Sequence, residues 1–475
     1  MAISDFTSTR PPIDPRARLR AFVRMAASLA LCLALFPLVS GAEPLIEVRL
    51  DQPQQQIVVM GTDMERSANA LQGAKNKEEI IKWVFEDTEG VDLLRVCFDK
   101  HQELERGRKN MGYYDLQVAS MRQIKAVRPD IRFWATPKTD YDGYGTKNNL
   151  PDWIYRGGGY SGGRYDPNKL EVGLFAKFLA DYLEHMQRMG VPIFGLSPMK
   201  EWSQVVSPEK TSDVIRALKG ECESRRLEMP IIVGPASWSV KGGIRDLKKV
   251  KKLGDAHLYA GFSTHQYQGA GEADMRRFVE LAEEMGQRAF DDETNIGGGG
   301  RTHGVEPRMS SPVGSFCRRA RGYRAGLAGE LVFEIWSRGI NSETRSIYFK
   351  RNGVAKRMRA YWLFRAFAST TLRAHYIPSG LVTPREGVET MAFLKGDDLT
   401  LWVMNQGEEG VESVDIALKG GQLKRRSGVE VLRWSEEIAS ERGESSVMQA
   451  ESETGWTVEV PPVSITRIRV RLGST

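Results

Sequence analysis

The sequence predicts an α/β fold, a (β/α)8 TIM barrel with a C-terminal β-sandwich side domain, and three observations carry this prediction. Short apolar stretches alternate eight times with stretches of helical periodicity, as in a closed parallel barrel. After residue 371 the apolar residues change to the period of two that is typical of antiparallel strands. The alternating segment LIEVRL, residues 45–50, precedes the barrel and has no place in its strand count, so we expect it to complete the side domain.

Length and composition fit this architecture. The chain has 475 residues, of which 41% are hydrophobic and 27% charged, as expected for a large barrel and one smaller domain with packed cores. The formal net charge of +6 is spread along the chain rather than gathered in runs. A nucleic-acid-binding protein would carry a basic stripe or a binding motif, and the sequence has neither. We therefore expect no nucleic-acid partner.

Residues 1–42 have the features of a cleavable signal peptide. Five arginines lead into an apolar run over residues 25–39, and Ser40, Gly41 and Ala42 supply small residues before the expected cut. The run has about 15 residues, fewer than the roughly 20 that a membrane-spanning helix needs. We expect a secreted or periplasmic protein without a membrane span in its mature chain, and an uncleaved anchor is the alternative.

Three cysteines follow the leader, Cys97, Cys222 and Cys317. They lie far apart, and no CxxC or Cys/His cluster indicates a metal site. We expect neither a metal nor another cofactor. The sequence leaves open whether the cysteines are buried thiols or whether two of them form a disulfide.

The predicted elements follow one another along the chain. Residues 43–56 hold the N-terminal strand of the β-domain, residues 57–371 the barrel and residues 372–475 the β-sandwich. The barrel strands are expected at residues 57–60, 92–98, 131–136, 193–197, 231–234, 260–265, 288–292 and 331–335. The helices are expected at residues 77–89, 114–127, 169–189, 208–226, 243–252, 272–285, 313–328 and 354–370. The glycine clusters fit no phosphate-binding motif, which disfavours an open doubly wound sheet.

Carboxylates follow the predicted fourth and seventh strands. The segment IFGLSPMKEW, residues 193–202, contains Glu201, and QRAFDDETN, residues 287–295, contains Glu293. Active sites of such barrels lie at the carboxyl ends of the strands, and strands four and seven stand on opposite sides of the mouth. The two glutamates should therefore face each other. Retaining glycosidases use such a pair, one carboxyl group as acid and the other as nucleophile.

Other strand ends carry side chains that suit a sugar-binding site. Arg95 could orient a carboxylate nucleophile, Tyr267 could donate a hydroxyl, and Trp336 could form the floor under a sugar ring. Each has a structural alternative as an ion-pair partner or a core residue, but their joint placement with Glu201 and Glu293 at five strand ends favours a site. The candidate substrate-binding residues are Arg95, Lys200, Trp202, His265, Tyr267 and Trp336.

At these residues the chain resembles the clan of barrel glycosidases whose acid/base and nucleophile follow strands four and seven, and within it glycoside hydrolase family 30. The segment MGVPIFGLSP before Glu201, the His-x-Tyr pattern of His265 and Tyr267, and the terminal β-domain carry the resemblance. It implies an exported retaining β-glycosidase that acts on a poly- or oligosaccharide by double displacement. Glu201 would be the acid/base and Glu293 the nucleophile.

Two positions depart from the family pattern. Lys200 stands where the clan has an Asn that holds the 2-hydroxyl of the sugar, and the third strand runs into Lys138 without the usual Trp. An acidic or altered sugar would tolerate Lys200 better. The departures also motivate two alternatives: a non-catalytic carbohydrate-binding protein on a glycosidase-like barrel, and a barrel enzyme for a non-sugar substrate. The sugar, the linkage and the oligomeric state stay open.

Overall fold

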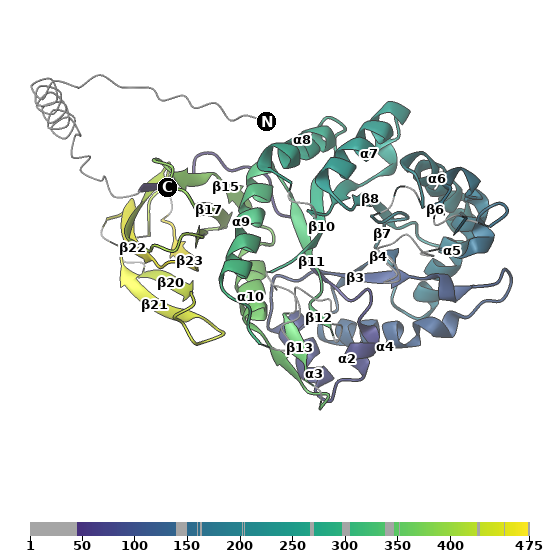
Figure 1. The fold of residues 1–475 in the computed structure, drawn as a ribbon, viewed down its shortest axis with the longest axis horizontal. Coiled ribbons are helices and arrows are strands. Elements are labelled where there is room, and N and C mark those ends of the chain that lie inside the picture. Colours follow the sequence, from purple (N-terminus) through teal and green to yellow (C-terminus); the bar gives the residue numbers. More distant parts are fainter. Residues whose placement is uncertain are drawn as a thin grey trace, which may run out of the picture. The chain divides into compact units, whose positions relative to one another are not determined.

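The computed structural model of the protein describes residues 45–138, 150–158, 160–161, 164–201, 203, 205–266, 270–296, 305–337, 346–350, 352–424, 428–450 and 452–473. The predicted signal peptide and two candidate site residues, Trp202 and Tyr267, lie outside these ranges. The described part forms a closed parallel barrel and a β-domain of two sheets (Figure 1). None of its helices is both long and apolar enough to cross a membrane.

The barrel closes with eight parallel strands in the predicted order, because the last strand pairs with the first, as Gly329 does with Val59. The most apolar strand reads LLRVCF and is buried throughout, as expected when helices cover the outside of a barrel and side chains fill its inside. Arg95 is the one charged residue in that strand. The barrel strands are β2 (Val59–Asp63), β3 (Leu93–Phe98), β4 (Arg132–Pro137), β7 (Gly195–Leu196), β8 (Ile231–Ser237), β9 (Gly261–Thr264), β10 (Ala289–Thr294) and β11 (Gly329–Val332).

Local capping explains where several barrel helices begin and end. The Ser207 and Ser239 hydroxyls accept hydrogen bonds from the backbone N–H of Lys210 and Gly242, which fixes the starts of α6 and α7. Gly254 ends α7 in the left-handed conformation that glycine adopts at low cost. The helices are α2 (Ala68–Gln72), α3 (Lys77–Ile81) with its π-helical continuation η1 (Lys82–Glu86), α4 (Asp115–Val127), α5 (Val172–Arg188), α6 (Pro208–Arg225), α7 (Val240–Leu253), α8 (Glu272–Glu283), α9 (Ser310–Ala325) and α10 (Arg359–Thr371).

The structure corrects the prediction around the eighth strand. Strand β11 ends at Val332, and the chain then forms a small separate sheet of β12 (Trp336–Ser337), β13 (Ile347–Phe349) and β14 (Ala355–Arg357). The last helix therefore begins at Arg359 rather than at residue 354, because Ala355–Arg357 pair with β13. Strands of two or three residues are too short to show a period. The other short elements are the hairpin β5 (Tyr160–Ser161) and β6 (Arg164–Tyr165) and the 3₁₀ turns η2 (Lys100–Gln102), η3 (Met111–Tyr114), η4 (Asp152–Ile154), η5 (Pro167–Lys169) and η6 (Ala256–Leu258).

The side domain is a two-sheet sandwich that includes the N-terminal strand, as predicted. β1 (Leu45–Arg49) lies between two later strands, antiparallel to β16 and parallel to β19. The sheets have the orders β16-β1-β19-β22 and β15-β17-β18-β23-β20-β21. Their later strands are β15 (His375–Ile377), β16 (Ser379–Leu381), β17 (Val388–Lys395), β18 (Asp398–Asn405), β19 (Val411–Lys419), β20 (Gly428–Trp434), β21 (Glu444–Gln449), β22 (Gly455–Val460) and β23 (Ser464–Arg471).

Strand β18 shows how the side domain attaches to the barrel. Leu401 and Val403 belong to the core between the two sheets. Trp402, which points to the other side, belongs to the core shared with the barrel helices. Its ring centroid lies 5.3 Å from that of Phe316 and 5.7 Å from that of Phe367. Aromatic contacts with α9 and α10 thus join the sandwich to the barrel.

The three cysteines are all free and buried, which decides between the two readings of the sequence. Burial raises the pKa of the Cys317 thiol to about 12, and a neutral thiol in that environment behaves as a small apolar side chain.

Candidate active site

Glu201 stands at the mouth of the barrel on an unusual backbone. It follows β7 and forms a parallel bridge with Ser237 at the end of β8. Its backbone N–H donates to the Ala236 carbonyl at 2.6 Å. Its φ of +62° is a left-handed conformation that costs a non-glycine residue about 1–2 kcal/mol. Such conformations persist where surrounding contacts enforce them, and they cluster at functional sites.

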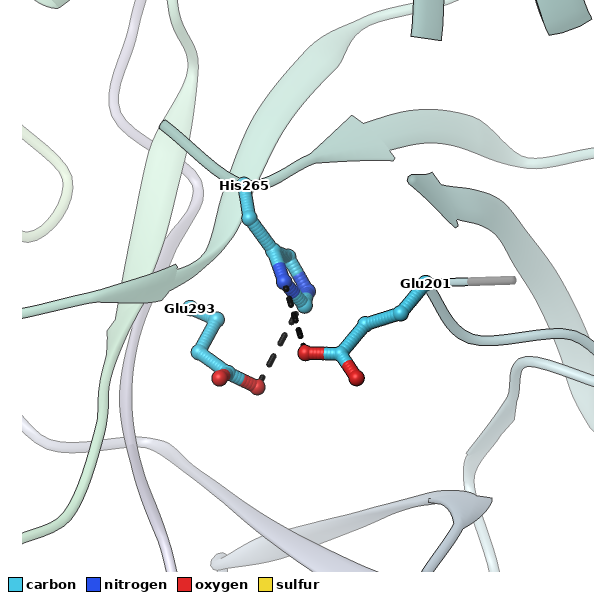
Figure 2. A group of neighbouring side chains, drawn as sticks. All are labelled: Glu201, His265 and Glu293. Atoms are coloured by element: carbon cyan, nitrogen blue, oxygen red, sulfur yellow. Dashed lines mark ion pairs between the residues drawn. The ribbon is translucent and has the colours of Figure 1, made fainter. Parts of the chain in front are cut away.

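His265 lies between the two glutamates (Figure 2). Its Nδ1 atom is 3.5 Å from Glu201 Oε1, and its Nε2 atom is 3.8 Å from Glu293 Oε2. One carboxylate oxygen of each glutamate and a ring nitrogen of His265 all lie within 4.8 Å of one another. The exposed fractions of Glu201, His265 and Glu293 are 8%, 0% and 6%, so the group is almost removed from water.

Two permanent cations contact Glu293. Its Oε2 atom lies 2.5 Å from Arg95 Nη2 and 3.2 Å from Lys200 Nζ. Burial alone raises the pKa of Glu293, but Lys200, Arg95 and His265 outweigh burial and hold this pKa well below its usual value. Glu293 is therefore ionised at neutral pH.

Two carboxylates that the sequence analysis did not assign complete the cluster. Asp63, at the end of β2, pairs with Arg95 Nε, and Glu65 pairs with Lys200 Nζ. Each cation thus bridges Glu293 and a carboxylate from the first strand end. Burial raises the pKa of Glu65, but Lys200 and Arg95 outweigh it and lower this pKa below its usual value. The only sequence signal was the mostly polar segment 62–66 at the end of the first strand.

The end of β10 explains how two consecutive residues reach His265. Asp292 Oδ1 lies 3.4 Å from His265 Nε2, next to the Glu293 contact. The pairing of β10 with β11 changes register between Asp291 and Thr294, and such irregularities re-aim side chains. Asp291 is instead bound by Gln266, whose Nε2 donates to its Oδ2 at 2.7 Å. Burial and Glu330 raise the pKa of Asp291 to about 7. Two of the three neighbouring carboxylates, Asp292 and Glu293, therefore face His265.

His265 carries a positive charge at neutral pH. Burial lowers its pKa, but Glu293 and Asp292 outweigh burial and raise the pKa to about 10. The imidazolium links the two glutamates electrostatically. Together with Arg95 and Lys200 it also disfavours a divalent metal, although three ligand atoms of Glu201, His265 and Glu293 are close enough to hold one. A metal would need the neutral imidazole.

This charge predicts how stability depends on pH. The folded-state pKa of His265 is raised to about 10, above its unfolded value of about 6.5. The contribution of His265 to folding stability is therefore fully present below pH 6.5 and is lost as the pH rises through about 10. We expect His265→Gln to destabilise the fold at pH 6 and the difference from the unmodified protein to shrink towards pH 10. Urea unfolding across this range measures it. The exposed His257→Gln is the control, and a pH-independent difference would contradict the assignment.

The structure sorts the six predicted substrate-binding residues. Arg95, Lys200 and His265 are brought together around Glu293. Trp202 and Tyr267 lie outside the described residues. Trp336 is a correction: its side chain is fully buried, donates Nε1–H to the Ser67 carbonyl at 3.3 Å and packs edge-on against Phe85. It therefore presents no ring face to a substrate.

A hollow of about 210 Å³ adjoins the cluster at Glu65, which is the cluster residue that lines it. Lys138, which follows the third strand, lines it and is fixed by Asp99 Oδ2 at 3.2 Å and by the Tyr113 hydroxyl at 2.7 Å. The other lining residues are Glu65, Arg66, Ala68, Asn69, Cys97, Tyr113, Tyr114, Leu116 and Gln117.

Comparison with known proteins finds this fold among solved glycoside hydrolase structures. No model of a known protein family matches the sequence, and no curated protein sequence does. A GH30 endoxylanase from Clostridium papyrosolvens has a TM-score of 0.66 at 14% identity, covering 90% of this chain and 100% of its own. SrfJ from Salmonella typhimurium has a TM-score of 0.68 at 14% identity, and the match covers 90% of this chain and 92% of SrfJ. A GH51 arabinofuranosidase from Xanthomonas axonopodis pv. citri has a TM-score of 0.59 at 12% identity, and the match covers 90% of this chain and 100% of the arabinofuranosidase. At such identities the likeness shows a shared fold, the one that the family 30 resemblance implied.

Proposed function

We propose that the protein is a retaining glycoside hydrolase in which Glu293 is the nucleophile and Glu201 the acid/base. One observation carries the proposal: oxygens of the two carboxylates lie within 4.8 Å of each other. Retaining enzymes hold their carboxyl groups about 5–5.5 Å apart, whereas inverting enzymes leave about 6.5–9.5 Å for a water molecule.

The proposed reaction has two displacements. The ionised Glu293 attacks the anomeric carbon, the glycosidic C–O bond breaks, and Glu201 gives its proton to the leaving oxygen. Water then attacks the glycosyl-enzyme ester, Glu201 takes a proton from it, and Glu293 leaves as a carboxylate. Arg95 and Lys200 orient Glu293 and hold it ionised, with contacts of 2.5 and 3.2 Å. The His265 imidazolium lies beside both glutamates and stabilises whichever of them is charged.

A saccharide substrate is supported by the fold, which a GH30 endoxylanase and a GH51 arabinofuranosidase share. We propose that the part of the substrate next to the cleaved bond binds in the hollow beside Glu65. The signal-peptide features of residues 1–42 support export, and therefore a poly- or oligosaccharide outside the cytoplasm.

The second candidate is a non-catalytic carbohydrate-binding protein, and Lys200 is the observation that favours it. Three cations around Glu293 stabilise its negative charge, which weakens it as a nucleophile. Incubation with 2-fluoro-glycosides of several sugars, followed by mass spectrometry, separates the two candidates. A glycosyl adduct on the peptide containing Glu293 supports hydrolysis. Binding to saccharides without any adduct supports the second candidate.

The acid/base role of Glu201 predicts rescue by azide. With Glu201→Gln we expect kcat on an aryl glycoside with a good leaving group to fall by about 10²–10⁴-fold, because proton transfer is lost. Azide needs no deprotonation, so it should attack the glycosyl-enzyme and yield a glycosyl azide of retained configuration. Product analysis by NMR measures this. Azide should not rescue Glu293→Gln in the same way, and an absence of rescue in Glu201→Gln would assign the acid/base to another residue.

A further inference from the structure

A second pocket, of about 560 Å³, is formed where the barrel helices meet the β20–β21 turn. We call it the arginine–tryptophan pocket. Its residues are Trp83, Ala355, Lys356, Arg357, Trp362, Ala439, Ser440, Glu441 and Arg442. It shares no residue with the carboxylate cluster around Glu293.

Stacking on tryptophan holds two guanidinium groups in this pocket. The Arg357 guanidinium carbon lies 4.6 Å from the ring centroid of Trp83 and 4.6 Å from that of Trp362. Arg442 lies 4.7 Å from the Trp362 centroid. A stacked guanidinium keeps its N–H donors in its own plane, at the edge of the rings, where they can bind an oxyanion.

The turn that carries Arg442 is itself fixed. Trp434 is buried, stacks on Trp402 and donates Nε1–H to the Glu441 carbonyl at 3.3 Å. Gly443 closes the turn at φ +81°, and a Cβ there would lie 2.7 Å from the Arg433 carbonyl oxygen. The backbone of the turn is therefore fixed before any ligand arrives, which lowers the entropy cost of binding.

Positive charge in the pocket exceeds negative charge. It contains three cationic side chains and one carboxylate, Glu441, which lies 3.8 Å from Lys356 Nζ. Among the described residues, no carboxylate lies within ion-pair distance of Arg357 or Arg442. Pre-oriented guanidinium groups without an anionic partner are a site for a carboxylate or a sulfate.

We infer that the arginine–tryptophan pocket binds an acidic saccharide through a sugar-borne carboxylate or sulfate, apart from the catalytic carboxylates. Its volume suits one or two sugar rings. Nucleic acid would need an extended basic stripe, whereas these charges are confined to one pocket. None of the exposed large hydrophobic residues of the described chain lines it, as a lipid surface would require.

The test measures binding by isothermal titration calorimetry with the whole mature protein. The probes are an oligogalacturonide, a chondroitin sulfate oligosaccharide and a neutral xylo-oligosaccharide of similar length. We expect Arg442→Ala to lower the affinity for at least one acidic probe about tenfold, the effect of losing one charge-assisted hydrogen bond. Affinity for the neutral probe should stay the same. The matched control is Arg385→Ala, because Arg385 is exposed on the same β-domain outside the pocket.

The acidic probe that binds identifies the group as carboxylate or sulfate. Equal binding of both acidic probes by the unmodified protein and Arg442→Ala overturns the inference. So does a single-stranded oligonucleotide that binds more tightly than either probe and loses affinity in Arg442→Ala. The readout is binding alone, so it stands whether or not Glu293 and Glu201 prove catalytic.

Discussion

Replacing Glu293 by Gln is expected to abolish turnover, with a fall in kcat on the order of 10⁴-fold or more, because an amide cannot form the glycosyl ester. The side chain keeps its size, so the barrel should still form. It loses the charge that Arg95 and Lys200 contact, so the melting temperature should fall as well. Release of an aryl leaving group measures kcat, and circular dichroism verifies the fold.

The matched control for this change is Glu330→Gln. Glu330 lies on the next strand, β11, and is also buried, but it pairs with Arg319 at 2.8 Å on the side of the helices. The Glu330→Gln substitution should lower the stability of the fold but leave kcat within a few-fold of that of the unmodified protein. If Glu293→Gln kept a tenth of the activity, the nucleophile would be another residue.

Replacing Lys200 by Met is expected to cost about 3–5 kcal/mol of folding free energy, because Glu65 and Glu293 would lose a buried partner. The pKa of Glu293 should rise towards its usual value. A carboxyl group whose pKa is lower in the folded state stabilises the fold at pH values above its unfolded pKa, and this stabilisation is lost as the pH falls through the folded-state pKa. With the folded-state pKa of Glu293 raised in Lys200→Met, acid unfolding should begin at a higher pH. Denaturant unfolding from pH 3 to 8 measures both effects.

The same substitution should change catalysis in the direction opposite to stability. With one cation fewer, Glu293 becomes a better nucleophile, and the acid limb of the kcat/KM profile should move to higher pH. Lys251→Met is the control, because Lys251 pairs at 2.6 Å with the surface residue Glu284, and losing such an exposed pair should change stability little. An unchanged acid limb in Lys200→Met would show that Lys200 does not set the charge of Glu293.

The barrel could be predicted from the sequence because its strands are covered on both faces. Such strands are almost entirely apolar, as β3 is, and continuous apolar runs are easy to find in a sequence. The sequence predicted the side domain because β18 alternates between two cores. It could not predict β12 to β14, since two or three residues show no period. It placed Trp336 in the site because that residue follows the eighth strand, but β11 ends earlier and the chain turns the ring into the core.

In the candidate site, too, some residues could be predicted from the sequence and others could not. Glu201 and His265 follow strands and Glu293 lies near the end of one, and parallel strands bring their carboxyl ends to one rim, so position along the chain was enough for these three. Arg95 lies inside β3, where it is the one charged residue of an apolar strand. Asp63 and Glu65 were missed because four of the five residues 62–66 at the end of the first strand are polar. Which of them turns inward depends on the stagger of the closed barrel, a property of all the strands together. The irregular pairing of β10 was equally invisible in the sequence.

The position of β1 has a consequence for the order in which the chain can fold. This strand lies inside its sheet, where Leu45 pairs with Asp415 and Ile46 with Leu381. During synthesis the first described strand therefore has no partner until almost the whole chain has emerged. The four-stranded sheet therefore cannot form before β19 and β22 have been made, and the long loop that must close to bring β1 to them makes this a slow step.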